Sequence, residues 1–315
     1  MAPASAGRLS LQDNRHSTDR GMHMSLQLKR IDHVAIVTPD IDKALPLWRD
    51  VLGMPVVKEG VIEEQGVRGV LLNAGDGEIE LIQPIRDDTG VARFLQERGE
   101  DLHHVAFETD DIAAELKRAK ALGIDLIDEE PREGLSGLVG FLHPKSNYGV
   151  LIELVQKVDA PLTPTDPKNQ PFAITGIDHV GIASRDIHGC SEHWVGKYDM
   201  PVFKEWGPEK ETGLESVSVE IGAGYLEVVT SHNPEDESVY VERALRKQGD
   251  GMIMMALKVR DFAGAMKAIP QQGVTLTEVL YLDHKMAMGR PIMHVPRKEA
   301  NGVRLQLIAE APVQV

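Results

Sequence analysis

Residues 31–48 read IDHVAIVTPDIDKALPLW, and residues 177–194 read IDHVGIASRDIHGCSEHW. Both stretches contain the frame I-D-H-V-x-I, followed at the same spacing by an Asp and a Trp. Two further pairs follow in the same order, GEIELIQP from Gly77 with GYLEVVTS from Gly224, and GVLIELVQ from Gly149 with GVRLQLIA from Gly302. Self-similarity of this kind marks a repeated structural unit. The sequence therefore predicts a duplicated domain.

A weaker repeat lies inside the first half, where LHHVAFETDDIAAEL from Leu102 resembles IDHVAIVTPDIDKAL from Ile31. Each copy begins with strand-like alternation, turns at an acidic or proline residue and continues with helical spacing. Shorter segments rich in Val, Ile and Leu follow, bounded by Gly, Asn and Asp, as is typical of strands and turns. We therefore predict an α+β fold in which each domain contains two βαβββ modules.

Composition indicates where the domains begin and end. Residues 1–27 lack apolar periodicity and the apolar core of a secretory signal, so we expect a disordered tail, with Met24 as a possible natural start. Residues 158–171 contain four prolines and have little capacity for helix or sheet, which predicts a linker over residues 158–173. The expected domains are residues 28–157 and 174–310.

Charge and cysteine content exclude several classes of function. The net charge of −15 repels nucleic acid phosphates, and no basic stretch offsets it. No apolar run reaches the roughly 18 residues of a membrane span. The single cysteine, Cys190, cannot form an internal disulfide, which fits a cytoplasmic protein.

Four polar side chains interrupt strands that are otherwise aliphatic: His33, Glu80, His104 and Glu153. Taken singly, each is more often an ordinary strand residue than a ligand, but all four occupy matching positions of a repeated module. Buried carboxylates are costly unless they are paired or bound to a metal, and imidazoles and carboxylates together suit a divalent cation. Alignment with His33 selects His104 over His103, and strand alternation predicts that His103 points to the opposite face.

The segments DHVAIVTPD, EQGV, IELIQP, HHVAFETDDI and FLHPKSNYGVLIELVQ resemble those of methylmalonyl-CoA epimerases. These enzymes belong to the vicinal-oxygen-chelate superfamily, together with glyoxalase I and the extradiol dioxygenases, and the resemblance covers residues 28–157. It implies tandem vicinal-oxygen-chelate domains, each a cup-shaped, mostly antiparallel sheet. It also implies one divalent ion (Co, Mn, Ni, Zn, Mg or Fe) inside the first cup, held by His33, Glu80, His104 and Glu153.

The resemblance further implies a metal-dependent epimerase (an isomerase) acting on a 2-substituted malonyl-CoA through a metal-stabilised enolate. Glu153 would be both metal ligand and base, and Lys145 in the HPKS segment would meet an anion of the coenzyme, with a solvated turn lysine as the equal alternative. One position departs from the pattern. Some epimerases carry a second catalytic acid where simple alignment places Gly69, and the nearby acids here are Glu63 and Glu64.

The second domain retains two of the four ligand positions and replaces the others; in chain order the residues are His179, Glu227, Met254 and Gln306. A thioether is a poor ligand for hard divalent ions and an amide brings no charge, so this site reads as degenerate. His284 and His294 could re-form a site, but we interpret them as solvated or core histidines. We expect this domain to pack on the first as an intramolecular pseudo-dimer, and a homo-oligomer of the whole chain is possible.

Three other functions remain open from the sequence. A glyoxalase I-like lyase or another isomerase of the superfamily would use the same ligands. An iron-dependent extradiol dioxygenase needs two His and one carboxylate with open positions, and Glu80 as a fourth protein ligand argues against it. A binding protein without catalysis would hold the metal but show no proton exchange with substrate.

Overall fold

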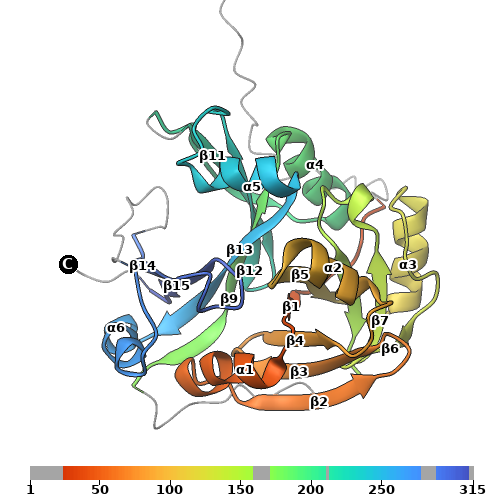
Figure 1. Ribbon diagram of the computed structural model, residues 1–315. Coiled ribbons are helices and arrows are strands. Elements are labelled where there is room, and N and C mark those ends of the chain that lie inside the picture. The colour runs from red at the N-terminus through yellow and green to blue at the C-terminus, as the bar shows by residue number, and fades with distance from the viewer. Residues whose placement is uncertain (1–23, 159–170, 211–212, 278–288, 312–315) are drawn as a thin grey trace, which may run out of the picture.

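The structure, a computed structural model, describes residues 24–158, 171–210, 213–277 and 289–311. The first half forms an eight-stranded sheet and the second half a seven-stranded sheet. In Figure 1 the red-to-yellow first half lies beside the green-to-blue second half. The elements of the first half are β1 (Ile31–Val37), α1 (Ile41–Leu45), the one-turn π-helix η1 (Pro46–Val51), β2 (Val56–Ile62), β3 (Val67–Asn73), β4 (Glu78–Pro84), α2 (Gly90–Arg98), β5 (Asp101–Glu108), α3 (Ile112–Ala121), β6 (Arg132–Glu133), β7 (Leu138–Leu142), the 3₁₀ turn η2 (Pro144–Ser146) and β8 (Ile152–Gln156).

The second half repeats this order of elements. Its described elements are β9 (Ala173–Ala183), α4 (Ile187–Tyr198), β10 (Val202–Trp206), β11 (Leu214–Ile221), β12 (Gly224–Ser231), α5 (Tyr240–Gln248), β13 (Gly251–Arg260), α6 (Phe262–Gln271), β14 (Ile292–Val295) and β15 (Leu305–Ala309). Residues 278–288, between α6 and β14, lie outside the described part of the chain. The order therefore matches the expected βαβββ modules in the first half and in the first module of the second half, while the described part of the last module is βαββ.

Strand order confirms the α+β fold with cup-shaped, mostly antiparallel sheets. The first sheet runs β2-β3-β4-β1-β5-β8-β7-β6 and the second β10-β11-β12-β9-β13-β15-β14. In each sheet the two modules meet through an antiparallel pair, β1–β5 or β9–β13. Parallel pairing is confined to β1–β4 and β5–β8 and their counterparts β9–β12 and β13–β15. The sequence repeat is thus a repeat of topology.

The Asp that recurs in the repeats begins the first helix of every module. Its side chain accepts a hydrogen bond from the backbone N–H three residues later, which satisfies a donor that the helix leaves unpaired. The four caps are Asp40 for α1, Asp111 for α3, Asp186 for α4 and Asp261 for α6. Such a cap contributes about 1 kcal/mol to stability. These aspartates therefore have a structural role and are not part of the candidate site.

The two halves pack through two equivalent close backbone contacts. In one the first half supplies the glycine and the second half the carbonyl, and in the other the second half supplies the glycine. A Cβ at Gly149 would overlap the carbonyl oxygen of Asp250, and a Cβ at the repeat-equivalent Gly302 would overlap that of Glu100. Both glycines have positive φ, 74° and 75°, which side chains rarely adopt. Asn301 adds a link across the halves, since its amide accepts from Trp48 Nε1 at 2.8 Å and donates to Glu100 at 2.9 Å. These paired contacts support the expected pseudo-dimer packing.

We expect Gly302→Ala to destabilise the protein by about 2–5 kcal/mol. The left-handed backbone costs roughly 1–2 kcal/mol for a residue with a Cβ, and overlap with Glu100 adds an overpacking cost of about 1–3 kcal/mol. Gly273→Ala is the matched control, because Gly273 also has positive φ (83°) but its Cβ would meet nothing within 4 Å. Urea unfolding of both variants measures the difference. Equal losses in the two would show that the inter-half contact is not tight.

The described chain extends beyond the expected first domain at its N-terminal end. Residues 1–23 of the expected tail lie outside the described residues, but residues 24–27 pack on the fold. Leu26 is buried, and its N–H donates to the carbonyl of Lys197 at the end of α4. Of the expected linker, residues 159–170 lie outside the described part, and β9 already begins at Ala173. Among the described residues, no helix is both long and apolar enough to cross a membrane.

Candidate metal centre

The candidate ligands lie on the four neighbouring central strands of the first sheet. Glu80 is on β4, His33 on β1, His104 on β5 and Glu153 on β8. Ala35 pairs across the sheet with both Glu80 and His104, and Ala106 pairs with both His33 and Glu153. Paired residues point to one face of a sheet, so two small side chains lie between the four large ones. We call this concave face the first cup.

The four polar side chains converge on one point. Their ligand atoms all lie within 4.8 Å of one another, and all four residues are buried. His33 Nε2 is 3.2 Å from His104 Nε2, and both nitrogens are 3.5 Å from a Glu80 oxygen. His104 Nε2 is also 3.1 Å from Glu153 Oε2. Two buried carboxylates need a cation, and two imidazole nitrogens turned towards them complete a donor set that fits a divalent ion.

A line of charges behind His33 fixes the orientation of its ring. Asp32 is fully buried and contacts His33 Nδ1 at 3.0 Å, while Arg30 and Lys157 each lie 3.0 Å from the Asp32 carboxylate. A carboxylate on Nδ1 holds the proton there and turns the Nε2 lone pair into the cup. Burial would raise the pKa of Asp32, but His33, Lys157 and Arg30 outweigh it and hold that pKa below its usual value.

His103 does not point away from the cup, so that prediction is wrong. A β-bulge between Leu102 and His104 breaks the alternation, and both histidines line the cavity of the first cup. His103 Nδ1 lies 2.9 Å from His104 Nδ1, and its ring packs edge-on against Phe94 of α2. Burial, and then the charge of His104, lower the pKa of His103 to about 3. Neutral His103 can therefore accept the Nδ1 proton of His104, as Asp32 does for His33.

The wall beside Glu80 is apolar at Gly69, where simple alignment places the second acid of some epimerases. Gly69 on β3 pairs with Gly60 on β2, and a Cβ on either would contact the side chain of Leu135. The Cβ at Gly69 would also lie 3.3 Å from Glu80 Oε1, so this position faces the candidate ligands. Leu135 thus covers the place where a second acid would project. Of the nearby acids, Glu64 lines a neighbouring cavity instead.

That neighbouring cavity, which we call the outer cavity, leads away from the first cup. Its volume is about 610 Å³, whereas the space left in the cup is about 30 Å³. The two share Gln65, Val91, His103 and Phe141 as lining residues. Its walls are mostly apolar, with Arg132 and His143 among the lining side chains. Lys145, the residue expected to meet a coenzyme anion, is exposed two residues beyond His143 on the turn η2.

The corresponding face of the second sheet, which we call the second cup, holds fewer ligand groups. His179 Nε2 and Glu227 Oε2 lie 3.8 Å apart, and Gln306 lines the same cavity. Met254 is buried against Gly181, the counterpart of Ala35. Among the described residues, the clusters of three or more potential metal ligands lie in the first half. His294 is buried and is not among the lining residues of this cavity, and His284 lies outside the described residues.

The metal-free protein should lose stability as the pH rises above about 6.5. Burial would lower the pKa of His33 and His104, but Asp32 and the cup carboxylates outweigh it and raise both above the ordinary 6.5. A raised pKa stabilises the fold below the unfolded value and loses that contribution through the folded value. Glu80 has the opposite shift, below its ordinary 4.5, so its contribution is lost in acid. Urea unfolding at a series of pH values in EDTA tests this, and bound metal should remove the loss at high pH.

Comparison with known proteins agrees with this geometry. A model of the glyoxalase/bleomycin resistance protein/dioxygenase superfamily matches residues 32–141. Mitochondrial methylmalonyl-CoA epimerase of Mus musculus is 39% identical over 132 residues, which are 41% of this chain and 74% of that protein. Ethylmalonyl-CoA/methylmalonyl-CoA epimerase of Cereibacter sphaeroides is 35% identical over 130 residues, 40% of this chain and 97% of that protein.

A solved structure extends the likeness of fold to the second half. A mutant of 4-hydroxymandelate synthase from Streptomyces coelicolor superposes with a TM-score of 0.68 at 17% identity, covering 91% of this chain and 94% of that one. The sequence matches show that the chain belongs to the glyoxalase/bleomycin resistance protein/dioxygenase superfamily.

Proposed function

We propose that the chain is a metal-dependent epimerase of a 2-substituted malonyl-CoA, with its reaction centre in the first cup. The observation that carries the proposal is the convergence of His33, Glu80, His104 and Glu153 on one buried point. The identity of the N-terminal region to methylmalonyl-CoA epimerases supports the acyl-CoA substrate. The second domain, with Met254 and Gln306 at two ligand positions, would stabilise the first without catalysing the reaction.

The four side chains would hold one divalent ion, and an ion that takes six ligands would accept two further oxygens from a substrate. A malonyl thioester presents its thioester and carboxylate oxygens as a chelating pair, and a divalent ion supplies Lewis-acid stabilisation of negative charge on them. Glu153 would then remove the proton from the carbon between the two carbonyl groups and return it. The neighbouring Asp32 and His103 hold the imidazole ligands in orientation. The outer cavity would take the thioester arm, with Lys145 near its rim for a coenzyme phosphate.

The apolar wall favours a second candidate from the same superfamily. Epimerisation requires a proton to leave one face of the carbon and return to the other. Leu135 packs over Gly60 and Gly69 and leaves that wall without a titratable side chain. An isomerase or a glyoxalase I-like lyase that handles the proton on one face would need only Glu153. This candidate uses the same metal ligands and differs in the fate of the proton.

Solvent isotope exchange tests the proposal directly. Metal-loaded protein in D₂O should place deuterium at C2 of methylmalonyl-CoA or ethylmalonyl-CoA, as followed by mass spectrometry. Metal-free protein should not, because the negative charge that forms at the substrate oxygens would lack its counter-charge. Absence of exchange with fully loaded protein and both thioesters would overturn the acyl-CoA epimerase reading.

A further inference from the structure

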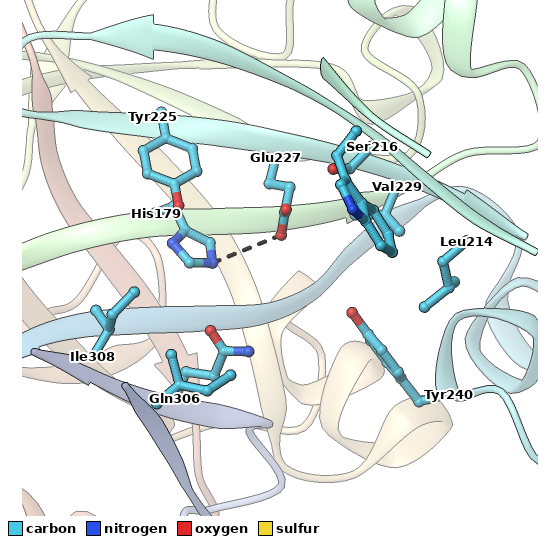
Figure 2. A pocket seen from close by; sticks show the side chains of 11 residues that line it. His179, Leu214, Ser216, Tyr225, Glu227, Val229, Tyr240, Gln306 and Ile308 are labelled. Atoms are coloured by element: carbon cyan, nitrogen blue, oxygen red, sulfur yellow. Dashed lines mark ion pairs between the residues drawn. The ribbon is translucent and has the colours of Figure 1, made fainter. Parts of the chain in front are cut away.

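The second cup is not filled by its substituted residues. It encloses a cavity of about 70 Å³, against about 30 Å³ for the space left in the first cup. A water molecule needs roughly 10–15 Å³ on this measure, so the cavity has room for about five such groups. Figure 2 shows its side chains converging from the sheet and from the helix α5, which supplies Tyr240. Two of the four ligand positions are substituted, but a partly open, ligand-sized space remains.

Several polar side chains face this space without hydrogen-bond partners among the described residues. Glu227 has only His179, at 3.8 Å, which is beyond hydrogen-bond range. The hydroxyls of Ser216 and Tyr240 and the amide of Gln306 line the cavity as well. In Figure 2 the Tyr240 hydroxyl and the Gln306 amide both point into the space between the labelled residues. The Glu227 side chain is 21% exposed, so water reaches this set of groups, and together they offer hydrogen bonds to a polar ligand that displaces it.

The acceptors of the cavity are held in place from behind. Asp178 contacts His179 Nδ1 at 2.8 Å and is itself paired with Arg290. Because Nδ1 is turned towards Asp178, the imidazole presents Nε2 to the cavity, beside the Glu227 carboxylate. Tyr225 stacks on the His179 ring, with the ring centroids 4.6 Å apart, and limits its movement. Two acceptors 3.8 Å apart can both receive N–H bonds, each about 2.9 Å long, from one nitrogen.

The charged groups that line the cavity indicate whether it favours a cationic or an anionic ligand. Among the described residues, its lining contains one carboxylate, Glu227, and no Lys or Arg. Lys204 lies outside the lining but interacts electrostatically with Glu227. Arg304 lies over the Tyr240 ring, 4.0 Å from its centroid. The remaining walls are aliphatic or aromatic: Leu214, Val229, Ile292, Ile308 and Trp206. Aromatic rings next to a carboxylate favour an ammonium group over an anion.

We propose that the second cup is a metal-independent binding site for a small primary ammonium compound. The charged nitrogen is held between Glu227 and His179, and its apolar stem lies against Val229, Ile292 and Ile308. The site does not depend on the reaction assigned to the first cup. It gives the second domain a role of its own, built from the two retained ligand positions, His179 and Glu227, and from apolar walls.

Isothermal titration calorimetry on the full chain in EDTA tests the site with three probes of one chain length. n-Butylammonium should bind, and n-butanol and butyrate should bind at least about tenfold more weakly, because each lacks the charged donor. Glu227→Gln should weaken n-butylammonium by a similar factor while keeping the shape of the side chain. Glu220→Gln is the matched control, because Glu220 is an exposed acid on β11 that does not line the cavity.

Four results would overturn the proposal. They are no measurable binding of n-butylammonium, equal binding of butanol or butyrate, unchanged affinity in Glu227→Gln, and equal loss in Glu220→Gln. Circular dichroism of both variants shows that they are folded. A divalent ion bound through His179 and Glu227 would also contradict it, and metal titration of His104→Ala protein, whose first cup lacks a ligand, would detect that ion.

Discussion

His104→Ala protein should bind a divalent ion at least about a hundredfold more weakly than the natural chain, which should bind about one ion. Loss of an outer hydrogen-bond partner of a ligand typically costs 10–100-fold in metal affinity, so loss of the ligand itself should cost more. His104 is also the most connected member of the cluster, since its Nε2 lies within 3.5 Å of His33, Glu80 and Glu153 atoms. Competition with a chromophoric chelator measures the affinity.

His179→Ala is the matched control for this measurement. His179 occupies the same place in the second repeat, but its neighbours Met254 and Gln306 give a divalent ion little charge or hardness. Metal content should therefore stay near one ion per chain in His179→Ala. Two tightly bound ions in the natural chain, or equal losses in the two variants, would contradict the degenerate reading of the second cup.

The duplication and the cluster could be predicted because both depend on patterns that the sequence states directly. Strand alternation places His33 and Glu80 on one face, and matching positions in the repeats bring His104 and Glu153 to the same place. The Asp of each repeat precedes a helical pattern, which is the known position of an N-cap. The repeat predicted the order of elements along the chain, whereas the order of strands within each sheet came from the structure.

The remaining features depend on three-dimensional contacts that a periodic pattern does not encode. The β-bulge at His103 inserts one residue and reverses the face that simple alternation assigns to it. Leu135 reaches Gly69 from a loop far along the chain, so its place in the wall is a tertiary contact. The cavity of the second cup could not be predicted either. Substitution of two ligand residues does not show whether the surrounding side chains fill the space that they leave.

Glu153→Gln should lower the rate of deuterium incorporation at C2 of methylmalonyl-CoA by about 10²–10⁴-fold, the usual contribution of a general base. The amide keeps an oxygen that can still coordinate weakly, so metal affinity should fall less than in His104→Ala. Metal content and exchange rate are therefore measured on the same sample. A Glu153→Gln protein that retains both metal and exchange would show that another group, such as Glu80, removes the proton.

Exchange and inversion, measured separately on the natural chain, then decide whether a second acid delivers a proton to the face opposite Glu153. Glu153 alone can remove and return the proton on one face, which gives exchange without change of configuration. Inversion requires a donor on the other face, where Leu135 covers Gly60 and Gly69. Equal rates of exchange and inversion would therefore mean that Glu63, Glu64 or a bound water delivers the second proton past this wall.

Gly69→Glu introduces an acid at this wall. If Leu135 moves aside to make room for the carboxylate, inversion should rise relative to exchange, as followed by chiral analysis of the thioester. The steric cost is a shift of Leu135, which a Cβ at Gly69 approaches to 3.0 Å. Leu135→Ala combined with Gly69→Glu removes that cost. If inversion still does not rise in the double variant, the position of the acid is not what limits epimerisation, and the one-face isomerase or lyase becomes the better reading of the first cup.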